Sequence, residues 1–139
     1  WDIWISPDGL LAFWEGPGIV GARDVLRAER ASVNADFNSP QSSVVSSTFE
    51  DTSPSLTADL LVMVFSSDRP GSAGAKDIWF ATRSELGMPF GDAQPVEGLN
   101  TPIHESELHI SDDGCELYFS RAEVTGYDYE LYRAEVVAP

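Results

Sequence analysis

Cysteine, histidine and basic residues are scarce in this chain of 139 residues. The single cysteine, Cys115, excludes an intramolecular disulfide and a thiolate-rich zinc site, while a secreted protein without disulfides stays compatible with it. Eight Lys and Arg residues against 23 Asp and Glu residues give a formal charge of −15. This charge argues against nucleic acids and anionic membranes as partners, because both require a basic surface. No apolar run approaches the roughly 20 residues that span a bilayer.

The composition is nevertheless that of a folded protein. Hydrophobic residues make up 42% of the chain and aromatic residues 11%, which is enough for a packed core, so the acidity does not indicate disorder. The length allows one compact domain and argues against two. We therefore expect a single acidic domain over residues 1–139.

Internal repetition is the strongest pattern in the sequence. Acidic landmarks recur at intervals of 53 residues in Asp24, Asp77 and Glu130. Turn aspartates recur at intervals of 51 and 54 residues in Asp8, Asp59 and Asp113. Aromatic residues follow the same two intervals in Trp14, Phe65 and Phe119. The spacing predicts three units, at about residues 1–52, 53–105 and 106–139.

The local chemistry of each unit is that of β-strands. Asp8-Gly9 and Asp113-Gly114 lie between apolar stretches, which is typical of hairpin turns because glycine accepts a positive φ. The apolar run Leu60–Phe65 predicts a strand buried on both faces. The Ser-rich stretch Ser39–Ser55 is interpreted as a polar loop with a short outer strand. Units of about four strands, repeated every 40–50 residues, are typical of propeller blades.

A resemblance to a known repeat strengthens this interpretation. It rests on Ser6-Pro7-Asp8-Gly9, on Ser66–Arg69 followed by Asp77-Ile78-Trp79, and on Ser111–Gly114 followed by Leu117–Ser120. These motifs resemble the WD40-like β-propeller repeat of the TolB type, found in bacterial envelope proteins. The resemblance implies an all-β fold of about three four-stranded antiparallel blades, the last incomplete, and a periplasmic or extracellular location. The second unit departs from the motif at Thr57-Ala58-Asp59-Leu60, which lacks the turn glycine, and the third lacks the second serine and places Arg121 one step early.

Three blades are too few for a closed propeller, which has about four to eight. We therefore expect an open arc or one half of a closed propeller. The third unit ends after its alternating strand and the first has no outer strand before it, so blade faces and strand edges are expected to be exposed and to favour association. The partner is a second copy that completes a six-bladed ring, or another protein. An arc that is stable alone is the third alternative.

Binding or scaffolding through protein–protein contacts, without catalysis, is the function that this interpretation favours. The loops after the three aromatic landmarks are expected to form the binding surface, and the acidity favours a basic partner. The candidate binding residues are Trp1, Trp4, Arg69 and Arg121. Trp1 and Trp4 qualify because exposed aromatic side chains are frequent in sugar-binding and protein-binding surfaces. Two alternatives stay open: a structural subunit of a larger complex, and a metal-dependent carbohydrate-active enzyme.

The enzyme alternative depends on His104, Glu105 and His109, because imidazole and carboxylate groups are common ligands of transition metals. On a regular strand Glu105, Glu107 and His109 share one side, whereas His104 does not. The other interpretation is a polar strand start near a propeller channel. Calcium is a further possibility at Asp112–Gly114 and Tyr127–Glu130, although neither segment has EF-hand spacing. We expect no cofactor, with a transition metal or calcium as the alternatives.

The remaining residues of interest are interpreted as structural. Six aromatic residues at repeat-equivalent strand positions are expected to pack between blades: Trp14, Phe65, Trp79, Tyr118, Phe119 and Tyr132. Cys115 is expected to be a packed small hydrophobic residue at the start of a buried strand.

Overall fold

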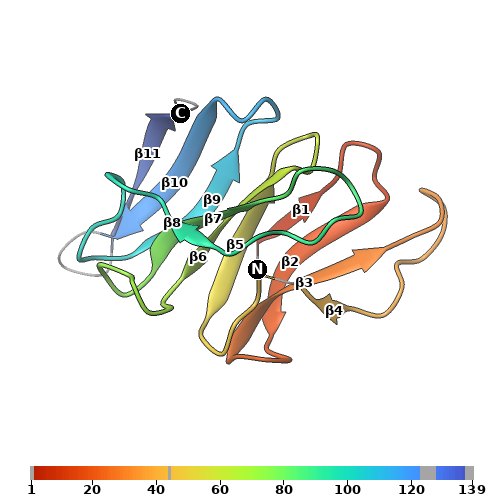
Figure 1. The fold of residues 1–139 in the computed structure, drawn as a ribbon, viewed down its shortest axis with the longest axis horizontal. Coiled ribbons are helices and arrows are strands. Elements are labelled where there is room, and N and C mark those ends of the chain that lie inside the picture. The colour runs from red at the N-terminus through yellow and green to blue at the C-terminus, as the bar shows by residue number, and fades with distance from the viewer. Residues whose placement is uncertain (1, 44, 123–127, 137–139) are drawn as a thin grey trace.

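The computed structural model describes residues 2–43, 45–122 and 128–136. Within these ranges eleven strands form three antiparallel sheets, which confirms the all-β prediction. The sheets follow one another in chain order and lie side by side as an open fan (Figure 1), so we call them blades 1 to 3. The described part of the chain contains no helix with the length and apolar character needed to span a membrane.

Each blade is built from strands that are consecutive in the chain. Blade 1 contains β1 (Ile3–Ile5), β2 (Leu11–Pro17), β3 (Arg23–Glu29) and β4 (Gln41–Ser42). Blade 2 contains β5 (Asp51–Leu56), β6 (Val62–Ser67), β7 (Asp77–Thr82) and β8 (Gln94–Pro95). The described strands of blade 3 are β9 (Glu105–Ile110), β10 (Glu116–Ala122) and β11 (Tyr129–Glu135). Neighbouring strands in each blade pair antiparallel, as consecutive strands joined by a hairpin connection do.

The Asp-containing turns have the same construction in all three blades. In blade 1 the Asp8 carboxylate accepts hydrogen bonds from the Ser6 hydroxyl at 2.6 Å and from the Leu10 amide at 2.9 Å. Asp59 and Asp113 do the same with the residues two before and two after them. Glycines with φ of 72° and 73° complete the turns of blades 1 and 3, and in blade 2 Leu60 takes the equivalent left-handed conformation at 63°. The absent glycine therefore leaves the turn unchanged.

Two strand predictions need correction. The strand β6 begins at Val62 instead of Leu60, because the first two residues of the apolar run belong to the turn. The second correction concerns Ser39–Ser55, which holds the expected outer strand β4 but also the first five residues of β5, and β5 is buried throughout. A polar strand can be buried here because the Ser53 and Ser55 hydroxyls accept hydrogen bonds from backbone amides of β9, both at 3.1 Å.

The described residues form two hydrophobic cores, and each face of blade 2 contributes to one of them. Met63 and Phe65 pack toward blade 1, whereas Val64 and Ile78 pack toward blade 3. The first core also contains Phe13, Val25, Val45, Leu56, Trp79 and Ala81. The second also contains Leu108, Ile110, Leu117 and Phe119. Alternation along each strand thus lets one sheet bury both faces.

Blades 1 and 3 each have a second face that no described strand covers. Strand register assigns the outward face of blade 1 to Ile3, Ile5, Ala12, Trp14, Leu26 and Ala28. It assigns the outward face of blade 3 to His109, Glu116, Tyr118, Tyr129, Leu131 and Arg133. Of the six aromatic residues expected between blades, Trp14 and Tyr118 therefore lie on outward faces. Cys115 is exposed rather than packed, because it still belongs to the turn before β10.

Candidate functional site

Two of the predicted binding residues, Arg69 and Arg121, lie in ion pairs inside blades 2 and 3 respectively. Arg69 Nη2 is 2.6 Å from Oδ1 of Asp51, at the start of β5. Arg121 Nε is 2.8 Å from Oε1 of Glu105, at the start of β9. Both carboxyl side chains are fully buried, so each guanidinium compensates a negative charge that has lost its hydration. Neither arginine is presented to a ligand as a free cation.

The same two arginines fasten each blade to the chain segment that leads into it. An Nη2 group of Arg69 donates to the Val45 carbonyl at 2.7 Å, and that of Arg121 donates to the Leu99 carbonyl at 2.6 Å. Each guanidinium also stacks on aromatic rings of its own blade. The distances to the ring centroids are 4.7 Å for Phe65 and 4.6 Å for Tyr132. In the sequence, the repeat spacing of 54 residues between the two acids, Asp51 and Glu105, is the signal that could have revealed this arrangement.

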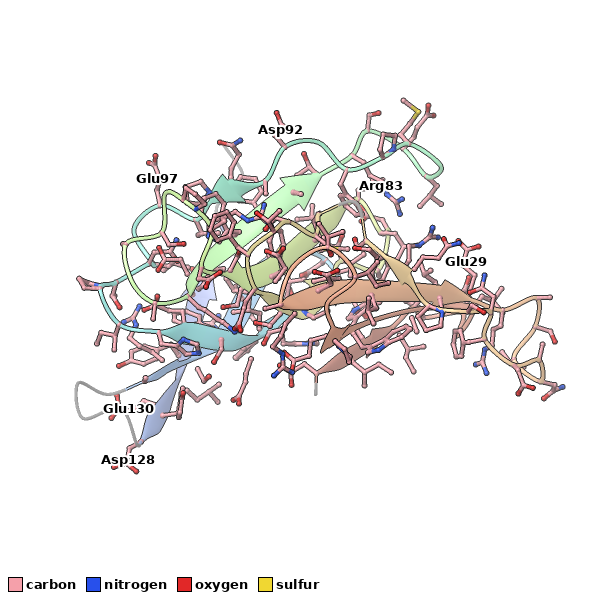
Figure 2. The ribbon with its side chains drawn as sticks, turned by 90° about the horizontal axis from the view of Figure 1, so that it is seen from below. Glu29, Arg83, Asp92, Glu97, Asp128 and Glu130 are labelled. Atoms are coloured by element: carbon pink, nitrogen blue, oxygen red, sulfur yellow. The ribbon has the colours of Figure 1, made fainter. Side chains whose placement is uncertain are left out.

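The repeated acids Asp24 and Asp77 shape loops and are not surface charges. Burial by itself would raise the pKa of Asp24, but hydrogen bonds from the amides of Val20, Gly21 and Ile19 lower this pKa overall. Asp77 accepts from the equivalent amides of its own loop. Other acids are exposed: Figure 2 shows Asp92 in the loop between β7 and β8, Glu97 on the connection between blades 2 and 3, and Asp128 and Glu130 at the start of β11.

Trp4 and His109, predicted for different roles, meet in one groove of about 250 Å³. The groove runs along the innermost strands β1, β5 and β9 and is lined by Asp2, Ile3, Trp4, Pro54, Ser55, Glu107, Leu108 and His109. Trp4 packs against Phe13 at a centroid distance of 6.2 Å, which fixes one wall of the groove. Trp1 lies outside the described residues. The groove offers an aromatic ring, an imidazole and carboxylates, which suits a polar ligand.

The prediction that Glu105, Glu107 and His109 share one side of the strand is wrong for Glu105. A β-bulge interrupts the pairing of β9 with β10, and Glu107 there has a φ of 53°. His109 pairs with Tyr118 and Glu105 with Arg121, on opposite faces of the sheet. Burial lowers the pKa of the His104 imidazole, and the nearby Lys76 lowers it further, so this ring is neutral at neutral pH.

In residues 2–43, 45–122 and 128–136, no three His, Cys, Asp or Glu side chains form a group that could hold a metal ion. Glu105 is occupied by Arg121 and by the Thr101 hydroxyl. At the calcium candidates, the Asp113 carboxylate accepts hydrogen bonds within its own turn, and Tyr127 lies outside the described residues.

Comparison with known proteins supports the fold. No family model and no curated protein matches the chain. Among solved structures, TolB from Acinetobacter baumannii is similar, with a TM-score of 0.56 and 18% sequence identity over 94% of this chain. The chain spans 28% of the length of that structure. At this identity the likeness concerns the fold alone: the three blades of this chain have the fold of part of a β-propeller.

Proposed function

We propose that this chain is a non-catalytic binding and scaffolding module of the bacterial envelope or exterior, whose blade 1 docks a second copy. One observation carries the proposal: the outward face of blade 1 is apolar, and no described strand covers it. Ile3 and Ile5 on this face are 63% and 48% exposed. Beside them is a hollow of about 470 Å³ lined by Ile3, Ala12, Trp14, Ala28, Phe37, Asn38 and Pro40. Apolar surfaces of this kind mark protein-interaction sites.

A second copy suits this face because the chain carries a second outward face, on blade 3, with exposed apolar side chains. On the outward face of blade 3, Leu131 and Tyr129 are 76% and 53% exposed. If blade 3 of one copy packs on blade 1 of the other, two identical contacts close a six-bladed ring with two-fold symmetry. In such a ring the grooves at the innermost strands face the central channel. The resemblance of the repeat motifs to envelope proteins supports the location.

The oligomeric state tests the proposal. Sedimentation velocity of the chain over a wide concentration range is expected to show twice the chain mass of 15.1 kDa. Ile5→Lys should produce a monomer, since it places a charge in the centre of the contact. Ile19→Lys is the matched control, because Ile19 is 62% exposed and lies outside the outward face, in the β2–β3 loop.

Two results would contradict the proposal. A clean 15.1 kDa monomer at high concentration would exclude the second copy as partner and favour a subunit of a larger complex. One equivalent of tightly bound transition metal in the purified protein would contradict the non-catalytic assignment and favour the carbohydrate-active enzyme.

A further inference from the structure

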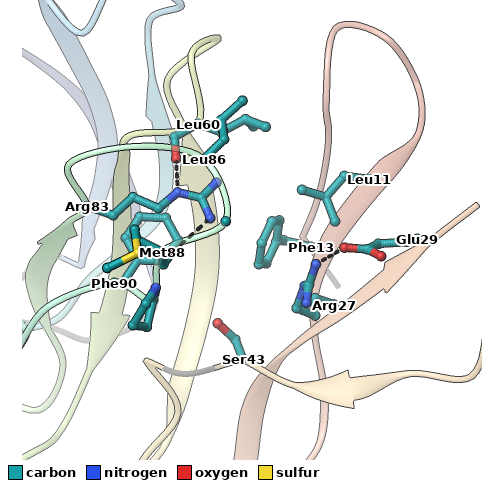
Figure 3. Close-up of a pocket in the computed structure, with 12 residues that line it drawn as sticks. Leu11, Phe13, Arg27, Glu29, Ser43, Leu60, Arg83, Leu86, Met88 and Phe90 are labelled. Atoms are coloured by element: carbon teal, nitrogen blue, oxygen red, sulfur yellow. Dashed lines mark hydrogen bonds and ion pairs between the residues drawn. The ribbon is translucent and has the colours of Figure 1, made fainter.

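A pocket of about 550 Å³ opens between blades 1 and 2, next to the Asp-containing turn of blade 2 (Figure 3). Strands β2 and β3 form one side, and the turn at Leu60 with the loop after β7 forms the other. The apolar wall consists of Leu11, Phe13, Leu60, Leu86, Met88 and Phe90. Leu86 and Met88 are 61% and 49% exposed, so a ligand that covers them gains apolar contact. The volume is within the range of small-molecule sites.

The polar groups of this pocket are mainly cationic, although the whole chain is acidic. Arg27 and Arg83 enter from the two facing blades, and Glu29, which pairs with Arg27, lies on the same side as that residue (Figure 3). Arg83 donates to the Leu60 carbonyl at 2.7 Å and stacks on Phe90, but pairs with no carboxylate in the described part of the chain. The pocket therefore holds one guanidinium that lacks a counter-charge.

We propose that this pocket binds a carboxylate attached to an apolar chain. The carboxylate would lie between the two guanidinium groups, which form strong charge-assisted hydrogen bonds with such anions. The apolar chain would cover Leu86 and Met88. A fatty-acid anion and the carboxyl terminus of an apolar peptide share this chemistry. The proposal is independent of ring formation, because the pocket lies between blades 1 and 2 and not on an outward face.

A titration with octanoate, followed by the methyl NMR signals of the two methionines, tests the proposal. Met88 lines the pocket, while Met63 is fully buried in the core and serves as internal reference. Octanoate should shift the Met88 signal to saturation, whereas octylammonium should bind at least about tenfold more weakly. Equal binding of octanoate, octanol and octylammonium would overturn the proposal, as would the absence of any Met88 shift with octanoate. The titration is made on Ile5→Lys, so that self-association does not interfere.

Matched variants separate ligand binding from structural support. Arg83→Gln should weaken octanoate binding about tenfold, the loss of one charged hydrogen bond. Arg30→Gln is the control, because Arg30 likewise stacks on a ring, that of Phe37, and donates to a turn carbonyl, but does not line the pocket. Glu29→Gln should tighten binding, since it frees the charge of Arg27. Equal effects of the two arginine variants, or weaker binding to Glu29→Gln, would contradict the proposal.

A peptide arm identifies the source of the carboxylate. The probes are acetyl-Gly-Leu-Leu with a free carboxylate and the same peptide as its amide. Tighter binding of the acid than of octanoate indicates a chain terminus, and tighter binding of octanoate indicates a free amphiphile. If the acid and the amide bind equally well, the carboxylate plays no part and the proposal fails.

Discussion

The same face of the repeat is covered in blade 3 and open in blade 1. In blade 3 this face carries Phe119, is covered by blade 2 and includes the ion pair of Arg121 with Glu105. In blade 1 it carries Trp14, and the position of Arg121 on the strand is taken by Gly16. No described blade covers it. Every repeat thus has the apolar strand. Among the described residues, the buried ion pair between an arginine and an acid occurs only in blades 2 and 3, each of which packs on a preceding blade.

The largest expected difference between the two faces is in the free energy of unfolding. Phe119→Ala should lower it by about 3–5 kcal/mol, because a buried ring leaves a cavity between blades. Trp14→Ala should cost only about 1 kcal/mol, since its face is open. Urea unfolding in the monomeric Ile5→Lys background measures both. Equal losses would show that the face of blade 1 is covered after all.

The ion pair should have the next largest effect. Arg121→Ala should destabilise the protein by about 3 kcal/mol, because it leaves the Glu105 carboxylate buried without a counter-charge. Arg133→Ala removes an ion pair on the outward face of blade 3, and its effect should be much smaller because Glu116 stays hydrated. Replacing both Arg121 and Glu105 by methionine should recover most of the lost stability. A double variant as unstable as Arg121→Ala would contradict the desolvation argument.

The Asp turns should give the smallest effect and no difference between the blades. The amide of Cys115 and the Ser111 hydroxyl hold the pKa of Asp113 below its ordinary value of 3.8, and the Ser6 hydroxyl and the Leu10 amide do the same for Asp8. Because the folded state binds the proton more weakly, this stabilisation is complete above about pH 4 and disappears as the pH falls through the lowered pKa. Asp8→Asn and Asp113→Asn should therefore shift acid unfolding equally. Unequal shifts would show that the turns differ between blades.

Much of the fold could be predicted from the sequence because the signals are local. The Asp turns and the alternating strands follow from residues within a few positions of one another. Leu60 shows the limit of this approach, since its left-handed backbone replaces a glycine that the motif demands. The polar strand β5 was missed because its serine hydroxyls find their partners in blade 3, more than 50 residues further along the chain.

The candidate site was predicted less well, for the same physical reason. Arg69 and Arg121 are predicted as binding residues, but the structure uses their charges to compensate buried acids. Glu105 and His109 were grouped by strand alternation, and one bulged residue, Glu107, separates them. Trp4 and His109 come together only because innermost strands of different blades line a common groove.

By itself the sequence determined the repeat, the strands, the turns and the acidic character, because each depends on neighbouring residues or on composition. Only the tertiary structure decided which faces are covered, which acids are paired and where positive charge gathers. Coverage and the pocket depend on contacts between units about 50 residues apart. The buried acids pair with arginines of their own blade, but burial in the assembled fold gives those pairs their role, because a desolvated charge needs a partner. Arg83 and Arg30 share one local pattern, yet only Arg83 lines a pocket between two blades.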